Sequence, residues 1–149
     1  MAHQSAGRGI VQAQFLSHGT IACRDLAKSR RFYEEFLGLE VVHIAPQSMA
    51  LRLATDVYIA CVCLGEKAPN NTVWSHIGLN VGSQEDVDRV YAEALRCKED
   101  YAIDRIEAPR KLHGAYQFFL QDQDTNWWEI QYDARTIDDL FSLPDLDSN

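Results

Sequence analysis

Three residues of this 149-residue chain have side chains suited to a metal site, and they are His18, His76 and Glu129. Each lies in a short segment rich in apolar residues. Two imidazoles and one carboxylate that converge from three strands form a 2-His-1-carboxylate site, which leaves coordination positions open for substrate, water or dioxygen. The same ligands also hold catalytic zinc, so the ligand set does not identify the ion.

The alternation of side chains along a strand explains why these residues are expected to meet. Successive strand residues point to opposite faces. In 74–81 the face opposite the apolar set carries Trp74, His76, Gly78 and Asn80, and in 127–132 the corresponding face carries Trp127, Glu129 and Gln131. A buried carboxylate without a partner is unfavourable by several kcal/mol, so this face predicts a partner or a metal. A single strand histidine is usually an ordinary core or surface residue; the three residues together favour the metal.

The elements that must position these residues occur twice along the chain. The first half predicts a strand, a helix and three strands, at 15–23, 26–37, 39–45, 48–55 and 57–64. The second half predicts the same order, at 74–81, 84–97, 103–108, 114–121 and 127–132. Ser17-His18 and Ser75-His76 are 58 positions apart, and the apolar positions of the two helices keep that register. Such a repeat predicts an α+β fold in which two paired βαβββ modules form a curved mixed sheet around a metal cleft.

The expected domain organisation follows from the repeat. We expect residues 1–14 to form a disordered extension, 15–66 the first module and 74–133 the second. The turn-rich segment GEKAPNN between the modules is typical of a linker. Residues 134–149 are expected to form a short C-terminal helix and an acidic tail.

Composition excludes several classes of function. The net charge of −8 disfavours nucleic acid as a partner, because phosphate binding requires clustered Lys and Arg. No apolar run approaches the ~20 residues that cross a bilayer, and the N-terminus lacks the features of a secretory signal, so we expect a cytoplasmic protein. The four cysteines are expected to be free thiols, mostly buried.

These residues resemble the vicinal oxygen chelate superfamily, which includes glyoxalase I, bleomycin-resistance proteins, fosfomycin-resistance enzymes, methylmalonyl-CoA epimerase and extradiol dioxygenases. The resemblance covers about 15–133 and rests on SHGTIACRDLAKSRRFYEEFLGLEVV, SHIGLNV and FFLQDQDTNWWEIQY. It implies a homodimer with a U-shaped metal cleft, and it assigns metal binding to His18, His76 and Glu129. The late turn departs from the family's D-P-D-G-N-x-x-E pattern at Gln123 and Thr125, where Thr lacks the tolerance of Gly for positive φ.

The resemblance also bears on the reaction. Glyoxalase I and the epimerase add a fourth ligand from the last strand of the first module, but VYIACVCL has no acidic or amide residue. The set of three ligands is more similar to that of extradiol dioxygenases. We therefore expect Fe(II), with Mn, Zn or Ni as other possible ions, and a catechol-like aromatic substrate.

Several residues are candidates for the remaining roles. His113 is the best candidate for a proton shuttle, since its side chain titrates near neutral pH. Tyr116 is a second candidate donor; the alternative is that the inner face of its strand is formed by Ala115, Gln117, Phe119 and Gln121. Trp74, Phe119 and Trp127 are expected to form an apolar pocket for a planar molecule, and Arg52 either binds an anionic substrate or lies on an outer face.

The sequence is also compatible with other functions. Extradiol enzymes usually have Tyr at the position of Phe119, which weakens the dioxygenase assignment. A metal-dependent lyase or isomerase of the glyoxalase or epimerase type is the main alternative. A resistance protein that binds an aromatic drug without catalysis is another, and fosfomycin-type transfer is disfavoured because the strands expected to face the pocket are not basic.

Overall fold

The structure of the chain is a computed structural model that describes residues 10–11, 13–53 and 56–144. The chain divides into two units, Met1–Pro69 and Asn70–Asn149. Each unit contains one mixed sheet and one main helix, so the predicted α+β class is confirmed. The expected extension at 1–14 and the end of the acidic tail fall largely outside the described residues.

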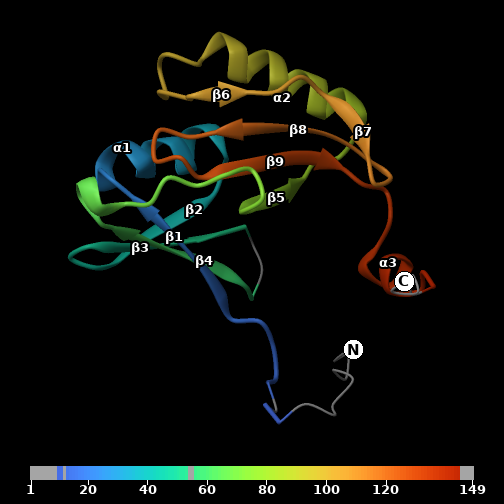
Figure 1. Cartoon of the computed structure of the whole chain (residues 1–149), viewed down its shortest axis with the longest axis horizontal. Coiled ribbons are helices and arrows are strands. Elements are labelled where there is room, and N and C mark those ends of the chain that lie inside the picture. Colours follow the sequence, from blue (N-terminus) through green and yellow to red (C-terminus); the bar gives the residue numbers. More distant parts are fainter. Residues whose placement is uncertain (1–9, 12, 54–55, 145–149) are drawn as a thin grey trace. The chain divides into compact units, whose positions relative to one another are not determined.

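The first unit has four strands in the spatial order β1-β4-β3-β2 (Figure 1). β1 is parallel to β4, and the other pairs are antiparallel. The elements are β1 (His18–Cys23), α1 (Leu26–Arg31), η1 (Phe32–Phe36), β2 (Glu40–Ala45), β3 (Ser48–Arg52), β4 (Tyr58–Cys63) and the short η2 (Gly65–Lys67).

The helix of the first unit differs from the single helix predicted over 26–37. It begins as expected, because the Asp25 carboxylate accepts a hydrogen bond from the Lys28 N–H at 3.1 Å and caps the first turn. After Arg31 it continues as a π-helix, in which the Leu37 N–H donates to the Phe32 carbonyl at 3.1 Å. This wider turn accompanies the burial of two adjacent aromatic side chains, Phe32 and Tyr33.

The second unit has the order β5-β9-β8-β6, and β7 also pairs with β8. β5 is parallel to β9, while β8 is antiparallel to its neighbours. The strand predicted near 103–108 is shortened to the two residues of β6, and β7, which the sequence did not predict, is a second short strand that pairs with β8. The elements are β5 (His76–Asn80), α2 (Gln84–Arg96), β6 (Arg105–Ile106), β7 (Arg110–Leu112), β8 (Ala115–Gln121), β9 (Trp127–Tyr132) and α3 (Ile137–Phe141).

The internal repeat is visible in the topology of the two sheets. In both, the first strand pairs in parallel with the last, and the last strand also pairs with the strand that precedes it in the chain, β3 or β8. The strand that carries His18 or His76 therefore lies beside the last strand of its own unit. In the second unit, this last strand carries Glu129.

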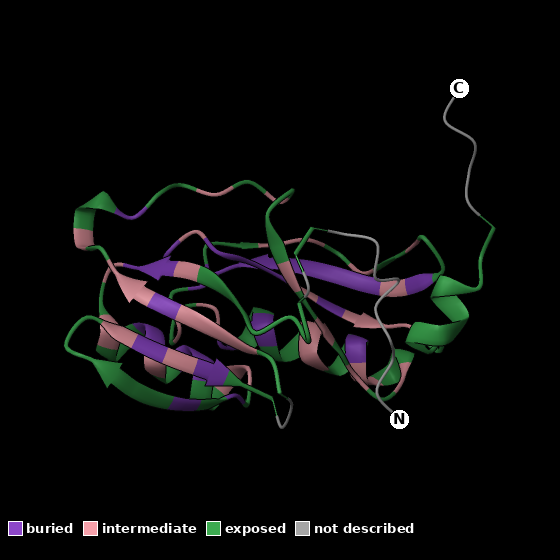
Figure 2. Ribbon diagram, turned by 90° about the horizontal axis from the view of Figure 1, so that it is seen from below, coloured by how far each residue is buried: buried purple, intermediate pink, exposed green. Residues whose placement is uncertain are grey.

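The core of the second unit lies between its sheet and α2, which runs along one face (Figure 1). Ser83 caps α2 by accepting from the Asp86 N–H at 3.1 Å. Val87 and Ala94 of the helix are buried at this face, and half-buried Tyr91 packs edge-to-face on buried Phe118 with ring centroids 5.5 Å apart. The long buried run of β8 is part of the purple stretch of sheet in Figure 2. No helix among the described residues has the length and apolar character needed to span a bilayer.

Candidate functional site

The pairing of β5 with β9 brings two of the three predicted ligands together. Gly78 lies opposite Glu129, and His76 lies opposite Trp127. Nε2 of His76 is 3.0 Å from Oε2 of Glu129. Gly78 leaves room for the carboxylate, since a Cβ added there would be 3.6 Å from the same oxygen.

The orientation of the His76 ring fits a metal ligand. Its Nδ1 lies 2.6 Å from the Val73 carbonyl, which accepts its proton and leaves Nε2 with the lone pair when the ring is neutral. A metal-bound histidine is usually fixed in this way. Two acceptor atoms this close require a proton or a cation between them. Ligands about 2.1 Å from one ion and at right angles would be about 3.0 Å apart, so the donor set fits a divalent ion.

His18 lies on β1 of the first unit, with an exposed side chain. Its Nδ1 is 2.9 Å from the Ser17 hydroxyl, and its ring stacks on Tyr58 with centroids 5.0 Å apart. Both histidines thus have Nδ1 engaged by a protein oxygen. Within the described part of the second unit, no further His, Cys, Asp or Glu joins the pair, so the participation of His18 stays a prediction.

A cavity of about 480 Å³ in the second unit contains the His76–Glu129 pair. Its apolar wall is formed by Val73, Trp74, Leu112, Ala115 and Phe119. The edge of the His76 ring meets the Phe119 ring, with centroids 5.0 Å apart and planes at 72°. Trp74 is 90% exposed and stands at the cavity without being packed. The cavity therefore combines a polar pair with a largely apolar, partly open wall.

The structure resolves which face of β8 is the inner one. Ala115, Gln117 and Phe119 line the cavity. Tyr116 lies on the helix side of the strand, where its hydroxyl donates to Asp88 at 2.7 Å and the pKa of Tyr116 is raised by that bond. The structure therefore does not bring Tyr116 to the His76–Glu129 pair.

Two further predicted residues lie apart from this cavity. Trp127 is buried and its Nε1 donates to the Asn71 carbonyl at 3.2 Å, beside a different cavity. Arg52, in the first unit, forms an exposed ion pair with Glu40, with Nε 2.7 Å from Oε2. That bond lowers the pKa of Glu40 and joins neighbouring strands β2 and β3.

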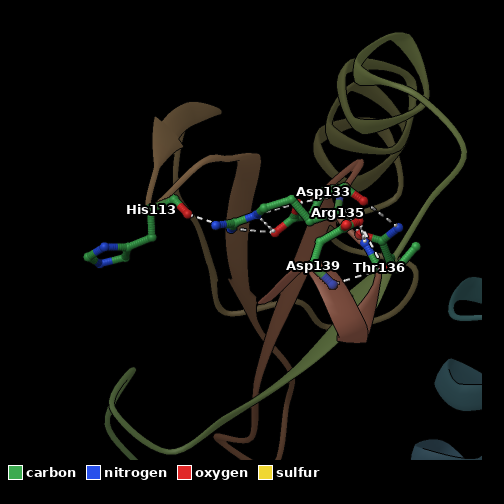
Figure 3. A network of polar contacts seen from close by, with 6 residues as sticks. His113, Asp133, Arg135, Thr136 and Asp139 are labelled. Carbon is green, nitrogen blue, oxygen red and sulfur yellow. Dashed lines mark hydrogen bonds and ion pairs between the residues drawn. The ribbon is translucent and has the colours of Figure 1, made fainter. Parts of the chain in front are cut away.

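His113 occupies the two-residue connection between β7 and β8. Its φ is 51° and that of Gly114 is 91°, the pair of positive values that a type I′ hairpin requires. The His113 carbonyl accepts from Nη2 of Arg135 at 2.7 Å. Figure 3 shows the imidazole on the side of the backbone away from this contact. His113 is exposed and lines the cavity.

Sequence reasoning missed the contact that fixes this hairpin. Asp133, two residues past Gln131 on the same alternating face, holds Arg135 through Nη2 at 2.7 Å and Nε at 3.0 Å (Figure 3). The hydrogen bonds from Arg135 lower the pKa of Asp133 to about 2. The alternation Glu129–Gln131–Asp133 was the available signal, but β9 ends at Tyr132, one residue before Asp133.

The turn between β8 and β9 positions the strand that carries Glu129. The buried Asp122 carboxylate accepts from the N–H groups of Asp124 at 2.8 Å and Asn126 at 3.0 Å, and from Trp128 Nε1 at 3.0 Å. Burial raises the pKa of Asp122 to about 7 despite these donors. Thr125 has φ 68°, so the turn keeps the positive φ although Thr replaces the family's Gly.

Comparison with known proteins assigns a family to this fold and site. The profile of the Glyoxalase/Bleomycin resistance protein/Dioxygenase superfamily matches residues 15–130. A comparison with curated protein sequences gives no significant match.

Solved structures show the same fold. The fosfomycin resistance protein FosX of Mesorhizobium loti has a TM-score of 0.60 and 20% identity, over 89% of this chain and 100% of that one. A possible glyoxalase of Bacillus cereus gives 0.62 and 23%, over 79% and 98%. Lactoylglutathione lyase of Agrobacterium tumefaciens gives 0.59 and 16%, over 82% and 96%.

Proposed function

Because the chain belongs to the glyoxalase/bleomycin resistance protein/dioxygenase superfamily, we propose that it is a divalent-metal-dependent enzyme whose ion is held by His18, His76 and Glu129. The observation that supports this most strongly is the 3.0 Å approach of His76 Nε2 to Glu129 Oε2. The Val73 carbonyl fixes the His76 tautomer that a ligand requires. Superfamily members are typically homodimers that bind small molecules, and we propose the same assembly here.

The reaction that we propose is extradiol cleavage of a catechol-like ring. A bound ion, with Fe(II) favoured over Mn, Zn or Ni, would supply a chelation point for two adjacent substrate oxygens and the redox chemistry with dioxygen. The chain's own groups would bind and orient the ring. Phe119 offers an apolar face next to His76, and Trp74 offers a second aromatic surface at the cavity.

Proton transfer in this proposal is assigned to His113. Phe119 has no hydroxyl, and Tyr116 lies on the helix side of β8, so neither serves the substrate. His113 lines the same cavity with an exposed imidazole, the side chain that most often serves in general acid–base catalysis. Arg135 positions the backbone of this turn through the His113 carbonyl, and the imidazole points away from that contact.

Metal binding is the first test. Protein reconstituted without oxygen with Fe(II), Mn(II) or Zn(II) should bind one ion per subunit. His76→Ala and Glu129→Ala should lower the affinity at least ~100-fold, because each removes a ligand. His18→Ala should do the same if the first unit contributes its histidine. His43→Ala, an exposed histidine of β2, is the matched control and should bind like the wild type. A native protein that takes up no ion would overturn the proposal.

Turnover is the second test. Iron-loaded protein should convert catechols in air to coloured ring-fission products, and His113→Gln should lower kcat about 100-fold with little change in metal content. Oxygen consumption at background level across a catechol panel, with metal bound, would instead favour a metal-dependent lyase or isomerase. Heat of binding from an aromatic drug without any product would favour sequestration. Sedimentation equilibrium tests the homodimer.

A further inference from the structure

A row of hydrogen-bonding side chains crosses the cavity floor beside the His76–Glu129 pair. Arg110 of β7 lies opposite Gln117 of β8, and Gln117 lies opposite Gln131 of β9. All three residues line the cavity. The row therefore presents two amides and a guanidinium to whatever occupies it.

Gln117 is the unusual member of this row. It is only 3% exposed, and its amide makes no hydrogen bond within the described part of the chain. Other buried polar side chains of this sheet and turn, such as Gln121 and Asp122, are hydrogen-bonded to protein groups. The amide atoms of Gln117 are not sealed from solvent, so they face the open cavity and are available to a ligand as their partner. Gln131 is half-buried and its amide also has no partner among the described residues.

The row lies at a defined distance from the metal pair. Gln131 follows Glu129 by two residues on one face of β9, and Gln117 precedes Phe119 by two on β8, a step of about 7 Å along a strand. This step is close to the length of one substituted benzene ring. A ring that chelates an ion at His76 and Glu129 would place a substituent on its far side at the two amides.

The charges around the row favour an anionic substituent. Arg110 is the cation of the row itself, with its guanidinium 6.0 Å from the Phe119 ring centroid. Its Nη2 is 3.3 Å from Glu107 Oε2, an exposed pair that leaves other N–H groups available. Asp133, the acidic residue that follows β9, is already paired with Arg135. The negative charge of Glu129, at the metal end of the cavity, would be neutralised by a bound ion.

We propose that Gln117, Gln131 and Arg110 form a subsite that binds a carboxylate of the substrate. The inference rests on the proposed function, since it takes the metal pair as the other end of the same substrate. Each amide donates an N–H to the carboxylate, and Arg110 supplies a charge-assisted donor.

The experiment measures binding of three probes to the Mn(II)-loaded protein by calorimetry without oxygen: catechol, 3,4-dihydroxybenzoate and 3,4-dihydroxybenzamide. The benzoate should bind the wild type at least about tenfold more tightly than catechol, as hydrogen bonds to a charged group imply. Gln117→Leu should abolish this preference and leave the Mn(II) stoichiometry unchanged. Gln117→Glu should repel the benzoate and still bind the benzamide. Gln84→Leu, an exposed glutamine of α2, is the matched control.

The outcomes separate the subsite from the metal site. Equal affinity for catechol and 3,4-dihydroxybenzoate in the Mn(II)-loaded wild type would overturn the subsite and leave the metal site standing. If no Mn(II) binds, the proposed function fails, and plain benzoate is titrated into the metal-free protein instead. Binding that Gln117→Leu removes then supports the subsite, and no binding overturns it. Thermal unfolding gives a further readout: Gln117→Leu should be about as stable as the ligand-free wild type, because the Gln117 amide makes no hydrogen bond to the described part of the chain.

Discussion

The two units share a topology but differ at the position where the chemistry is expected. On β1 of the first unit Thr20 lies opposite Ala60 of β4, whereas on β5 of the second Gly78 lies opposite Glu129 of β9. In the first unit the larger residue of the pair, Thr20, lies on the first strand. In the second unit the larger residue, Glu129, lies on the last strand. Both copies keep the histidine two residues earlier, and only one adds a carboxylate. The difference shows that one topology can keep the histidine on the first strand and add a carboxylate on the neighbouring strand, where a glycine leaves room for it.

The sheets also differ in how far they are buried. All but one residue of β8 are buried, while all but one residue of β2 are exposed. In the second unit, described polar residues such as Asp122 and Gln117 are buried. In the first unit the Arg52–Glu40 pair lies in solvent, where an ion pair contributes little to stability. The predictions below test this contrast.

The largest effect is expected from Asp122→Ala. This carboxylate is 1% exposed and satisfies three buried donors, so its loss should lower the free energy of unfolding by about 3 kcal/mol or more. Asp25→Ala removes the helix cap of the first unit and should lower it by only about 1 kcal/mol. Urea unfolding of both variants measures the difference. Equal losses of unfolding free energy would show that the hydrogen bonds of the buried Asp122 contribute no more than a helix cap at the surface.

The pH dependence of stability should separate two carboxylates of the second unit. With its pKa raised to about 7, folded Asp122 keeps a proton that the unfolded chain releases near 3.8, so its contribution is full below that value and is lost as the pH rises to about 7. Asp133 acts oppositely: its pKa is lowered to about 2, so its contribution is present above the unfolded value of 3.8 and is lost as the pH falls toward 2.

Asp122→Asn isolates the first of these two contributions. The stability difference between the wild type and this variant should shrink between pH 4 and 7, with a slope of at most about 1.4 kcal/mol per pH unit. Chemical denaturation at several pH values measures it. A difference that grows over this range would mean that the native turn holds Asp122 ionised.

Gly78→Thr gives the second unit the residue that the first unit has at the corresponding position, Thr20. The threonine branches should crowd the Glu129 carboxylate and weaken metal binding about tenfold or more, with little change in thermal unfolding. Gly78→Ala is the matched control, because its Cβ would make an ordinary 3.6 Å contact with Glu129 Oε2. Metal titration of both variants gives the answer. If Gly78→Thr binds metal like the wild type, Glu129 does not need the space that Gly78 provides.

Much of this framework follows from local patterns in the sequence. Asp25 and Ser83 predict where the helices begin, because their short polar side chains satisfy free N–H groups there. The alternation in β5 and β9 predicts that His76 and Glu129 share a face, and the structure places them in contact. The repeat accounts for the matching strand orders of the two units, but the sequence does not predict which order they share.

Other features depend on contacts that no local pattern encodes. AYQFFLQ has aromatic side chains on both faces, so periodicity alone cannot decide between Tyr116 and Phe119 for the cavity; Asp88 on α2 decides it. The contact of Arg135 with His113 joins residues 22 positions apart. The absence of a hydrogen-bond partner for the Gln117 amide within the described part of the chain depends on the side chains packed around it, which the local sequence does not specify. The π-helix after Arg31 likewise reflects packing of adjacent aromatics, since the sequence pattern is that of an ordinary amphipathic helix.

The smallest expected effects concern Thr125 in the turn that precedes β9. Its hydroxyl accepts from the Asn71 N–H at 2.9 Å, and its φ of 68° is unfavourable for a β-branched residue. Thr125→Ala loses the bond but keeps the φ, so it should lower the free energy of unfolding by about 1 kcal/mol. Thr125→Gly loses the same bond but removes the backbone penalty of about 1–2 kcal/mol, offset in part by the greater freedom of the unfolded chain. It should therefore match the wild type within about 0.5 kcal/mol and exceed Thr125→Ala in urea unfolding. If the two variants are equally stable, the positive φ carries no penalty, and the family's glycine at this position serves something other than the backbone of this turn.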